Sequence, residues 1–192
     1  MRDRGLHCEG PGARLTDAYF NARFDVLRKP LGFSPNAARL PDDDKAIHAW
    51  IELDDQQVIS IGRIHLIPPD SDGSTADTVD ENAAKCPNFA PLLDEGIKDV
   101  LGNQLPSIAS IRPAVQVRQM GTVDGYQRQG YASLILNALE IAAVDLWGEC
   151  TGFLQARVAA IPFYESLGWV CFDEKYVVDG IGLHCSMWKP LK

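Results

Sequence analysis

Hydrophobic and polar positions along the chain repeat with two periods, and each period predicts a different kind of element. Over residues 16–27 apolar side chains recur at helical spacing. Thr16, a residue type that caps helix N-termini, precedes them, and Pro30 ends the pattern. The apolar runs over 45–53 and 58–67 are typical of two strands, and Asp54–Gln57 between them is polar. The pattern therefore predicts an amphipathic helix followed by an antiparallel hairpin.

A second group of elements is expected after residue 113. The periodicity predicts strands over 114–123, 152–157, 169–178 and 183–188, and helices over 131–146 and 159–167. In the first of these helices the few polar positions, Ser133, Asn137 and Glu140, fall on one stripe, so we expect that helix to be mostly buried. This order of strands and helices indicates a mixed α/β fold.

Two segments lie outside this pattern. Residues 1–13 contain no periodic run, and we expect a flexible N-terminal tail there. Residues 68–109 begin as a Pro, Asp and Ser-rich loop and include an expected helix from Phe89 to Leu101, with an apolar face that includes Leu92 and Leu93. An insertion of this length is either a decoration or a functional lid. Its first acidic residues, which would select a cation, are Asp70, Asp72, Asp77, Asp80 and Glu81.

Composition narrows the class of protein. A chain of 192 residues with 46% hydrophobic and 23% charged residues is typical of one globular domain, here spanning 1–192, and no apolar run approaches the ~20 residues of a membrane span. A net charge of −8 argues against nucleic acid and anionic lipid as partners, and it suits a cationic amine as well as it serves solubility. The five cysteines are odd in number and widely spaced, which favours a reducing compartment, by default the cytoplasm.

One motif is suited to holding a phosphate. Gln127-Arg128-Gln129-Gly130-Tyr131-Ala132 lies between an expected strand and an expected helix. Small residues let the backbone approach a ligand, and the free N–H groups and positive end of the helix dipole attract anions. A pyrophosphate would fit there. Taken alone, the motif is equally compatible with an ordinary turn, whereas a Walker phosphate loop is excluded because no G-K-[S/T] follows.

A second motif, Ala160-Ile161-Pro162-Phe163-Tyr164-Glu165-Ser166-Leu167-Gly168-Trp169, follows the next strand. With these two motifs the chain resembles the GNAT superfamily, whose signature is [Q/R]-x-x-G-x-[G/A] and then A-x-x-x-Y-x-x-x-G-[F/W]. It is most similar to the ElaA-like branch, on three further segments. These are Arg23 to Val26, Asp42-Asp43-Asp44 with His48, and Asp179-Gly180-Ile181-Gly182-Leu183-His184.

The resemblance implies a fold and a reaction. The fold would be the α/β (α+β) GNAT fold, with a central mixed, mostly antiparallel, twisted sheet of about seven strands, helices on both faces and a V-shaped cofactor cleft. An amine would attack the thioester of acetyl-CoA directly, without a metal. Residues that match the family's cofactor-binding positions are Met120, Thr122, Gln127, Arg128, Gln129, Gly130, Tyr131 and Ala132. Backbone groups of the first two would hold the pantetheine arm and polarise the thioester, and the amides from Arg128 to Ala132 would hold the pyrophosphate.

The same resemblance assigns the general acid of the reaction but leaves the general base open. Tyr164 matches the tyrosine that protonates the departing CoA thiolate, and the alternative is a buried tyrosine whose hydroxyl is already paired. His65, His184 and Glu52 are candidates for the base, and each is also compatible with a packed or solvent-facing role.

Some residues depart from the family pattern or suggest other roles. Arg157 stands where many members carry Asn, Asp124 replaces a frequent Pro, and one extra residue precedes His184. Arg23 with the Asp42 to Asp44 run is expected to form a surface or half-buried ion pair. Cys171 and Cys185 have no paired base, so an acyl-cysteine intermediate is not expected.

These observations favour an N-acetyltransferase, with a small-molecule or peptide amine as its acceptor. Two alternatives stay open: a non-catalytic CoA-binding regulatory module, and a longer-chain acyltransferase related to the acyl-homoserine-lactone synthases. The sequence leaves the amine, the acyl length and a homodimer undetermined, because specificity in this fold lies in loops added to a common site.

Overall fold

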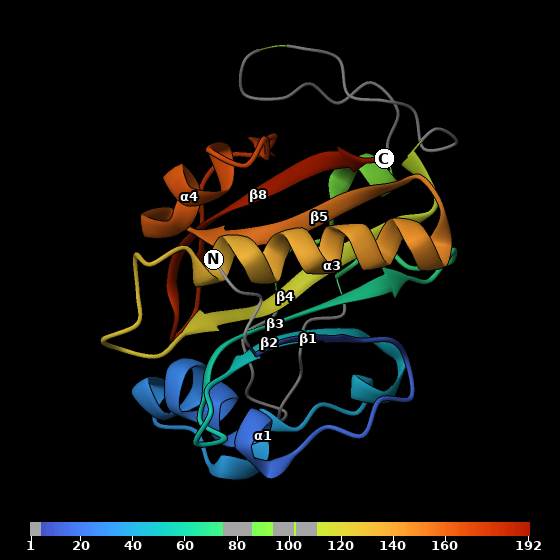
Figure 1. Ribbon diagram of the computed structural model, residues 1–192. Coiled ribbons are helices and arrows are strands. Elements are labelled where there is room, and N and C mark those ends of the chain that lie inside the picture. The colour runs from blue at the N-terminus through green and yellow to red at the C-terminus, as the bar shows by residue number, and fades with distance from the viewer. Residues whose placement is uncertain (1–4, 75–85, 94–101, 103–110) are drawn as a thin grey trace. The chain divides into compact units, whose positions relative to one another are not determined.

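The structure is a computed structural model that describes residues 5–74, 86–93, 102 and 111–192 (Figure 1). The α-helices in this part of the chain are α1 (Asp17–Arg23), α3 (Tyr131–Trp147) and α4 (Ile161–Glu165). The strands are β1 (Leu6–Glu9), β2 (Ile47–Glu52), β3 (Val58–Ile67), β4 (Ala114–Thr122), β5 (Cys150–Arg157), β6 (Val170–Cys171), β7 (Tyr176–Val178) and β8 (Gly182–Leu191). No helix among the described residues is long and apolar enough to cross a membrane.

The strands form one open, mixed sheet of eight strands. Their order is β1-β2-β3-β4-β5-β8-β6, with β7 paired to β8 (Figure 1). β4 and β5 are parallel, whereas β1–β2, β2–β3, β5–β8, β6–β8 and β7–β8 are antiparallel. The predicted class, a mostly antiparallel α/β sheet with helices, is confirmed.

By its contacts the chain divides into two compact units, and each is described by itself. The first comprises residues 1–65 and 117–146, and the second residues 66–116 and 147–192. The expectation of a single domain stays a prediction.

In the first unit the predicted helix and hairpin are present. The hydroxyl of Thr16 accepts from the Tyr19 amide at 3.3 Å and caps α1. A π-helical turn, Phe24–Arg28, continues that helix. The hairpin turn closes with the Leu53 amide donating to the Gln57 carbonyl at 2.9 Å. Tyr19, Trp50, Val58 and Ile61 form a buried cluster between α1 and the hairpin.

In the second unit an aromatic core covers one face of β4 and β5. Phe89 lies 4.9 Å from Phe153, and Phe153 lies 6.0 Å from Phe172, ring centre to ring centre. Ile67, Leu92, Ile111 and Ala114 complete the cluster. β5 and β8 stay in register over all eight residues of β5, from Cys150 opposite Leu191 to Arg157 opposite His184. This long ladder fixes which side chains of the second unit share a face.

Four expectations need correction or limitation. The expected tail contains β1, because residues 6–9 pair with β2 although most of their side chains are exposed. The expected strand over 169–178 is interrupted after Cys171, and β7 begins only at Tyr176. α3 is not mostly buried, because Leu134, Ile141 and Leu146 are 43–54% exposed. Of the expected helix over 89–101, the structure describes only a 3₁₀ turn at Ala90–Leu92, and residues 94–101 lie outside the described residues.

Candidate active site

The predicted phosphate motif forms the loop that leads from β4 into α3 (Figure 1). The first hydrogen bond of α3 runs from the Leu134 amide to the Gly130 carbonyl at 3.1 Å. The amides of Tyr131, Ala132 and Ser133 therefore have no acceptor within the helix. These N–H groups, at the positive end of a 17-residue helix, are suited to an anion.

Side chains of the loop hold its backbone rather than cover it. Gln127 donates to the Asp124 carboxylate at 2.9 Å, and Gln129 donates to the Gly125 carbonyl at 2.9 Å. Arg128 has φ 58° and Gly130 has φ 87°, both in the left-handed region. A Cβ added at Gly130 would meet nothing within 4 Å among the described atoms, so the space above this turn is open. The loop thus fits a pyrophosphate, which needs close backbone approach.

β4 carries the two predicted pantetheine contacts. Close packing fixes its backbone here, because a Cβ at Gly121 would come within 2.6 Å of Val26 in the π-helical turn. The Thr122 hydroxyl lies 2.9 Å from the Ser60 hydroxyl on β3, and Ser60 also donates to the Gly121 carbonyl at 3.3 Å. The Met120 side chain packs inward beside Gly62. The backbone of β4 at Met120 and Thr122 is therefore held in place by packing and hydrogen bonds.

Tyr164 lies in the second unit, on α4. It is 8% exposed, and burial raises the pKa of its phenol to about 12. Its ring contacts Trp169 with the centroids 6.3 Å apart. A phenol that stays protonated at all working pH values has the form that a general acid requires.

His184 lies on β8 in the same unit. Its Nδ1 is 2.8 Å from the Gly182 carbonyl, which only accepts, so Nδ1 carries the proton and Nε2 keeps its lone pair. Burial lowers the pKa of His184, so the ring is neutral at pH 7. Tyr164 packs on Trp169, and Trp169 covers the face of β5 to which Gly152 belongs. His184 is paired with Arg157, which shares the opposite face of β5 with Phe153. The two side chains therefore lie on opposite faces of the second unit's sheet.

The other two base candidates lie in the first unit. His65 lies two residues after Arg63, on the same face of β3. The charge of His65 helps to lower the pKa of Asp42, so His65 and Asp42 are neighbours. Glu52 accepts from the Trp50 indole at 3.4 Å, and its amide donates to the Gly5 carbonyl at 2.7 Å. Glu52 is thus engaged at the end of β2.

A buried ion cluster joins α1 to β3 in the first unit. Arg23 and Arg63 are both fully buried, and each has an Nη1 that lies 2.9 Å from the Asp43 carboxylate. Asp42 accepts from Arg63 at 2.6 Å. Burial alone would raise the pKa of Asp42, but the hydrogen bonds and charge of Arg63 outweigh it and hold that pKa at about 2. The expected ion pair of Arg23 with an aspartate is present, but its arginine is fully buried rather than at the surface or half-buried. Arg63 is a member that the sequence reasoning missed.

His48 completes this cluster as a neutral ring. Its Nε2 donates to the Asp43 carbonyl at 2.8 Å, so Nδ1 accepts from the Tyr19 hydroxyl at 3.0 Å. Tyr19 in turn accepts from Arg23 at 2.8 Å. Burial is the main cause that lowers the pKa of His48 to about 4. The cluster is a buried hydrogen-bond network, in which Nε of Arg23 is left without a partner among the described residues, and such a network suits a structural role.

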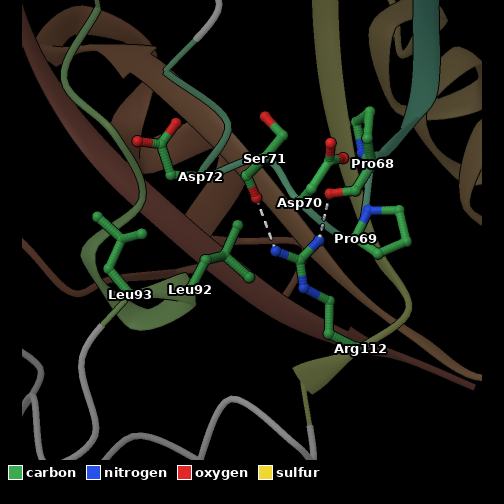
Figure 2. Close-up of a pocket in the computed structure, with 8 residues that line it drawn as sticks. All are labelled: Pro68, Pro69, Asp70, Ser71, Asp72, Leu92, Leu93 and Arg112. Atoms are coloured by element: carbon green, nitrogen blue, oxygen red, sulfur yellow. Dashed lines mark hydrogen bonds between the residues drawn. The ribbon is translucent and has the colours of Figure 1, made fainter.

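The described part of the expected insertion borders a cavity of 570 Å³ in the second unit. Figure 2 shows Arg112 bracing its rim, with donation to the carbonyls of Pro68 at 2.9 Å and Ser71 at 2.7 Å. Asp70 and Asp72 line it together with Leu92 and Leu93. Phe89 and Leu92 are buried in the core, so this end of the insertion is docked as expected, although Leu93 is 54% exposed. Asp77, Asp80 and Glu81 lie outside the described residues.

Comparison with known proteins agrees with this geometry. Residues 100–189 match the family model of the acetyltransferase (GNAT) domain. No curated protein sequence matches the chain significantly. Among solved structures, an acyl-CoA N-acyltransferase from Pseudomonas aeruginosa has a TM-score of 0.58 at 17% identity, covering 96% of this chain and 97% of that one.

Two further solved structures share the fold. Escherichia coli ElaA has a TM-score of 0.61 at 14% identity and covers 96% of this chain and 99% of its own. Arabidopsis thaliana NAA60, solved in complex with acetyl-CoA, has a TM-score of 0.60 at 10% identity, with coverage of 97% and 98%. The match over residues 100–189 identifies an acetyltransferase (GNAT) domain in that part of the chain, and the shared fold of the solved acyl-CoA N-acyltransferases extends over nearly all of the chain.

Proposed function

We propose that this chain is an N-acetyltransferase that transfers the acetyl group of acetyl-CoA to an amine by direct attack. The observation that carries the proposal is the open turn at Gly130, with three unpaired helix amides behind it. NAA60 was solved with acetyl-CoA, and an aminoglycoside 6'-N-acetyltransferase of the same fold was solved with coenzyme A. The net charge of −8 is compatible with a cationic acceptor.

In this proposal each candidate residue has one task. The amides from Arg128 to Ala132, with the side chains of Gln127 and Gln129 bracing the loop, hold the pyrophosphate. The Met120 and Thr122 backbone polarises the thioester carbonyl. A base first takes a proton from the ammonium, and the free amine then attacks the thioester carbonyl carbon and forms the C–N bond. As the tetrahedral intermediate breaks its C–S bond, Tyr164 gives its proton to the departing thiolate, and the proton that the new amide nitrogen loses restores the phenol.

For the base, His184 is supported by its tautomer, because its Nε2 is a ready acceptor, whereas its position on the opposite face of the sheet from Tyr164 counts against it. His65 is the second candidate, and its position beside Asp42 and Arg63 ties it to the buried ion cluster. A His184→Gln variant with kcat lowered at least about tenfold, against a small effect of His65→Gln, would support this order.

The test of the function is release of free CoA thiol from acetyl-CoA across a panel of amines. Turnover that depends on both substrates, and on Gly130, supports an N-acetyltransferase. Binding of acetyl-CoA without turnover of any amine would instead indicate the non-catalytic module. Faster turnover with a longer acyl-CoA than with acetyl-CoA would indicate the longer-chain enzyme.

We also propose that the insertion over 68–109 covers part of the amine site and selects cations through its carboxylates. Removing the whole segment is a poor test, because Phe89 is fully buried in the core. Asp70→Asn with Asp72→Asn changes only charge, and it should raise KM for a cationic amine while leaving acetyl-CoA binding intact. An unchanged KM would reject the lid.

A further inference from the structure

Two polar groups of the second unit, the Gln116 amide and the Trp188 indole N–H, are buried without a hydrogen-bond partner among the described residues, and they lie on one face of the sheet. Gln116 on β4 is 1% exposed, and neither its Nε2 nor its Oε1 has a hydrogen-bond partner within the described ranges. The indole Nε1 of Trp188 on β8 is in the same condition. Leaving such groups unpaired destabilises the folded state, and native proteins pair the large majority of their buried polar groups.

The strand register places these groups at one level of the sheet. Gln116 is opposite Phe153, and Phe153 is opposite Trp188. Cross-strand partners share a face and neighbouring strands are about 4.8 Å apart, so the Gln116 and Trp188 backbones are roughly 10 Å apart with the Phe153 ring between them. Phe89 and Phe172 pack on that ring.

A neighbouring glutamine shows the contrast. Gln155 lies two residues after Phe153 on the same face, and its Nε2 donates to the Pro87 carbonyl at 2.9 Å. Ser186, opposite Gln155, lies 3.2 Å from the Tyr176 hydroxyl. One step further along the same face, the polar side chains are therefore hydrogen-bonded within the protein, whereas the Gln116 amide is not.

We propose that Gln116 is a specificity-determining residue that binds the amide group of the acceptor, so that the acceptor is an apolar amine that bears a carboxamide or peptide amide. This rests on the proposed function. A primary carboxamide offers a donor and an acceptor side by side, and another amide satisfies both at once. A carboxylate would pair with Nε2 alone and would face Oε1 with a like charge. The Trp188 N–H supplies a further donor, and the aromatic cluster supplies an apolar wall.

The test compares three amines that differ at one group: phenylalaninamide, phenylalanine and phenethylamine. We expect the wild type to have the highest kcat/KM for phenylalaninamide, by about tenfold or more over phenethylamine, because a hydrogen-bonding site disfavours an analogue that leaves it unpaired. Gln116→Leu roughly keeps the volume but removes both polar atoms, and it should lower kcat/KM for phenylalaninamide by about tenfold or more, so that the preference over phenethylamine is lost. Equal loss for all three amines, or an unchanged preference, overturns the proposal.

A second measurement does not depend on turnover. Gln116→Leu should raise the melting temperature of the free protein by a few degrees, since it removes an unpaired buried amide, whereas Gln155→Leu should lower it. With CoA present, phenylalaninamide should stabilise the wild type but not Gln116→Leu. A lowered melting temperature in Gln116→Leu, or an equal ligand shift in both proteins, overturns the inference. Absence of acetyl-CoA binding would instead count against the proposed function.

Discussion

The carboxylate of Asp43 is the point where the buried ion cluster is most sensitive to change. Its oxygens lie 2.9 Å from Nη1 of Arg23 and 2.9 Å from Nη1 of Arg63, and one accepts the Leu40 amide at 2.9 Å. Both guanidiniums are 0% exposed, and the other carboxylate of the cluster, Asp42, is 42% exposed. Asp43→Asn would keep the shape of the side chain, but it would leave the two buried guanidinium groups with Asp42 as the one remaining carboxylate of the cluster.

The expected loss follows from that geometry. Breaking a buried ion pair by removing one partner costs about 3–5 kcal/mol, because the remaining charge stays desolvated. With a urea m-value of ~2 kcal/mol/M, this moves the unfolding midpoint down by roughly 1.5–2.5 M. Urea unfolding at pH 7, followed by circular dichroism, measures it.

Asp44→Asn is the matched control, because Asp44 is the next residue, is exposed and has no ion-pair partner among the described residues. It should change the free energy of unfolding by less than about 0.5 kcal/mol. A free energy of unfolding for Asp43→Asn within about 1 kcal/mol of this control would be on the order of a surface change. In that case the cluster does not anchor α1, and the reasoning is refuted.

Three further outcomes are expected. Gly62→Ala should destabilise by about 1–3 kcal/mol, because the added Cβ would meet the Met120 sulfur at 2.4 Å and Ile135 at 2.7 Å, while Gly10→Ala, with nothing within 4 Å, should be neutral in the same urea assay. The pKa of His48 is lowered in the folded state to about 4, so the contribution of the neutral ring to the free energy of unfolding is present above pH 6.5 and is lost as the pH falls toward 4. A His48→Gln variant should therefore lose less stability over that pH window. Tyr164→Phe should lower kcat by ~100-fold or more with little change in acetyl-CoA affinity. Because burial raises the pKa of Tyr164 to about 12, the wild-type rate should not fall through ionisation of this group below about pH 11. An unchanged kcat, with chemistry rate-limiting, would leave Tyr164 a packing residue.

Long periodic segments could be predicted from the sequence almost to the residue. β3 and β4 agree with the expected ranges, and so does α3 within one residue, since each has many apolar positions in one period. β1 was not predictable, because four mostly exposed residues carry no alternation and are strands only through their pairing with β2. The broken strand before β7 likewise depends on its pairing with β8.

The site divides in the same way. The loop around Gly130 and the residue Tyr164 could be proposed as site residues because their motifs are local in sequence. Arg63 and Gln116 could not. Arg63 joins Arg23 only when β3 packs near α1, and a glutamine in an apolar strand gives no sign that its amide lacks a partner. Burial and pairing are properties of the fold, so they appear only when distant segments are brought together.

Calorimetric titration of acetyl-CoA into three proteins tests the central claim most directly. Gly130 and Gly148 stand at opposite ends of α3, with φ 87° and 79°, and a Cβ at either would meet nothing within 4 Å among the described atoms. Glu at the two positions therefore adds a similar backbone strain and the same charge, but only Gly130→Glu places that charge at the predicted pyrophosphate site. The wild type and Gly148→Glu should bind acetyl-CoA, and Gly130→Glu should not. No binding heat from the wild type at saturating ligand, or equal affinity in Gly130→Glu, would contradict the assignment.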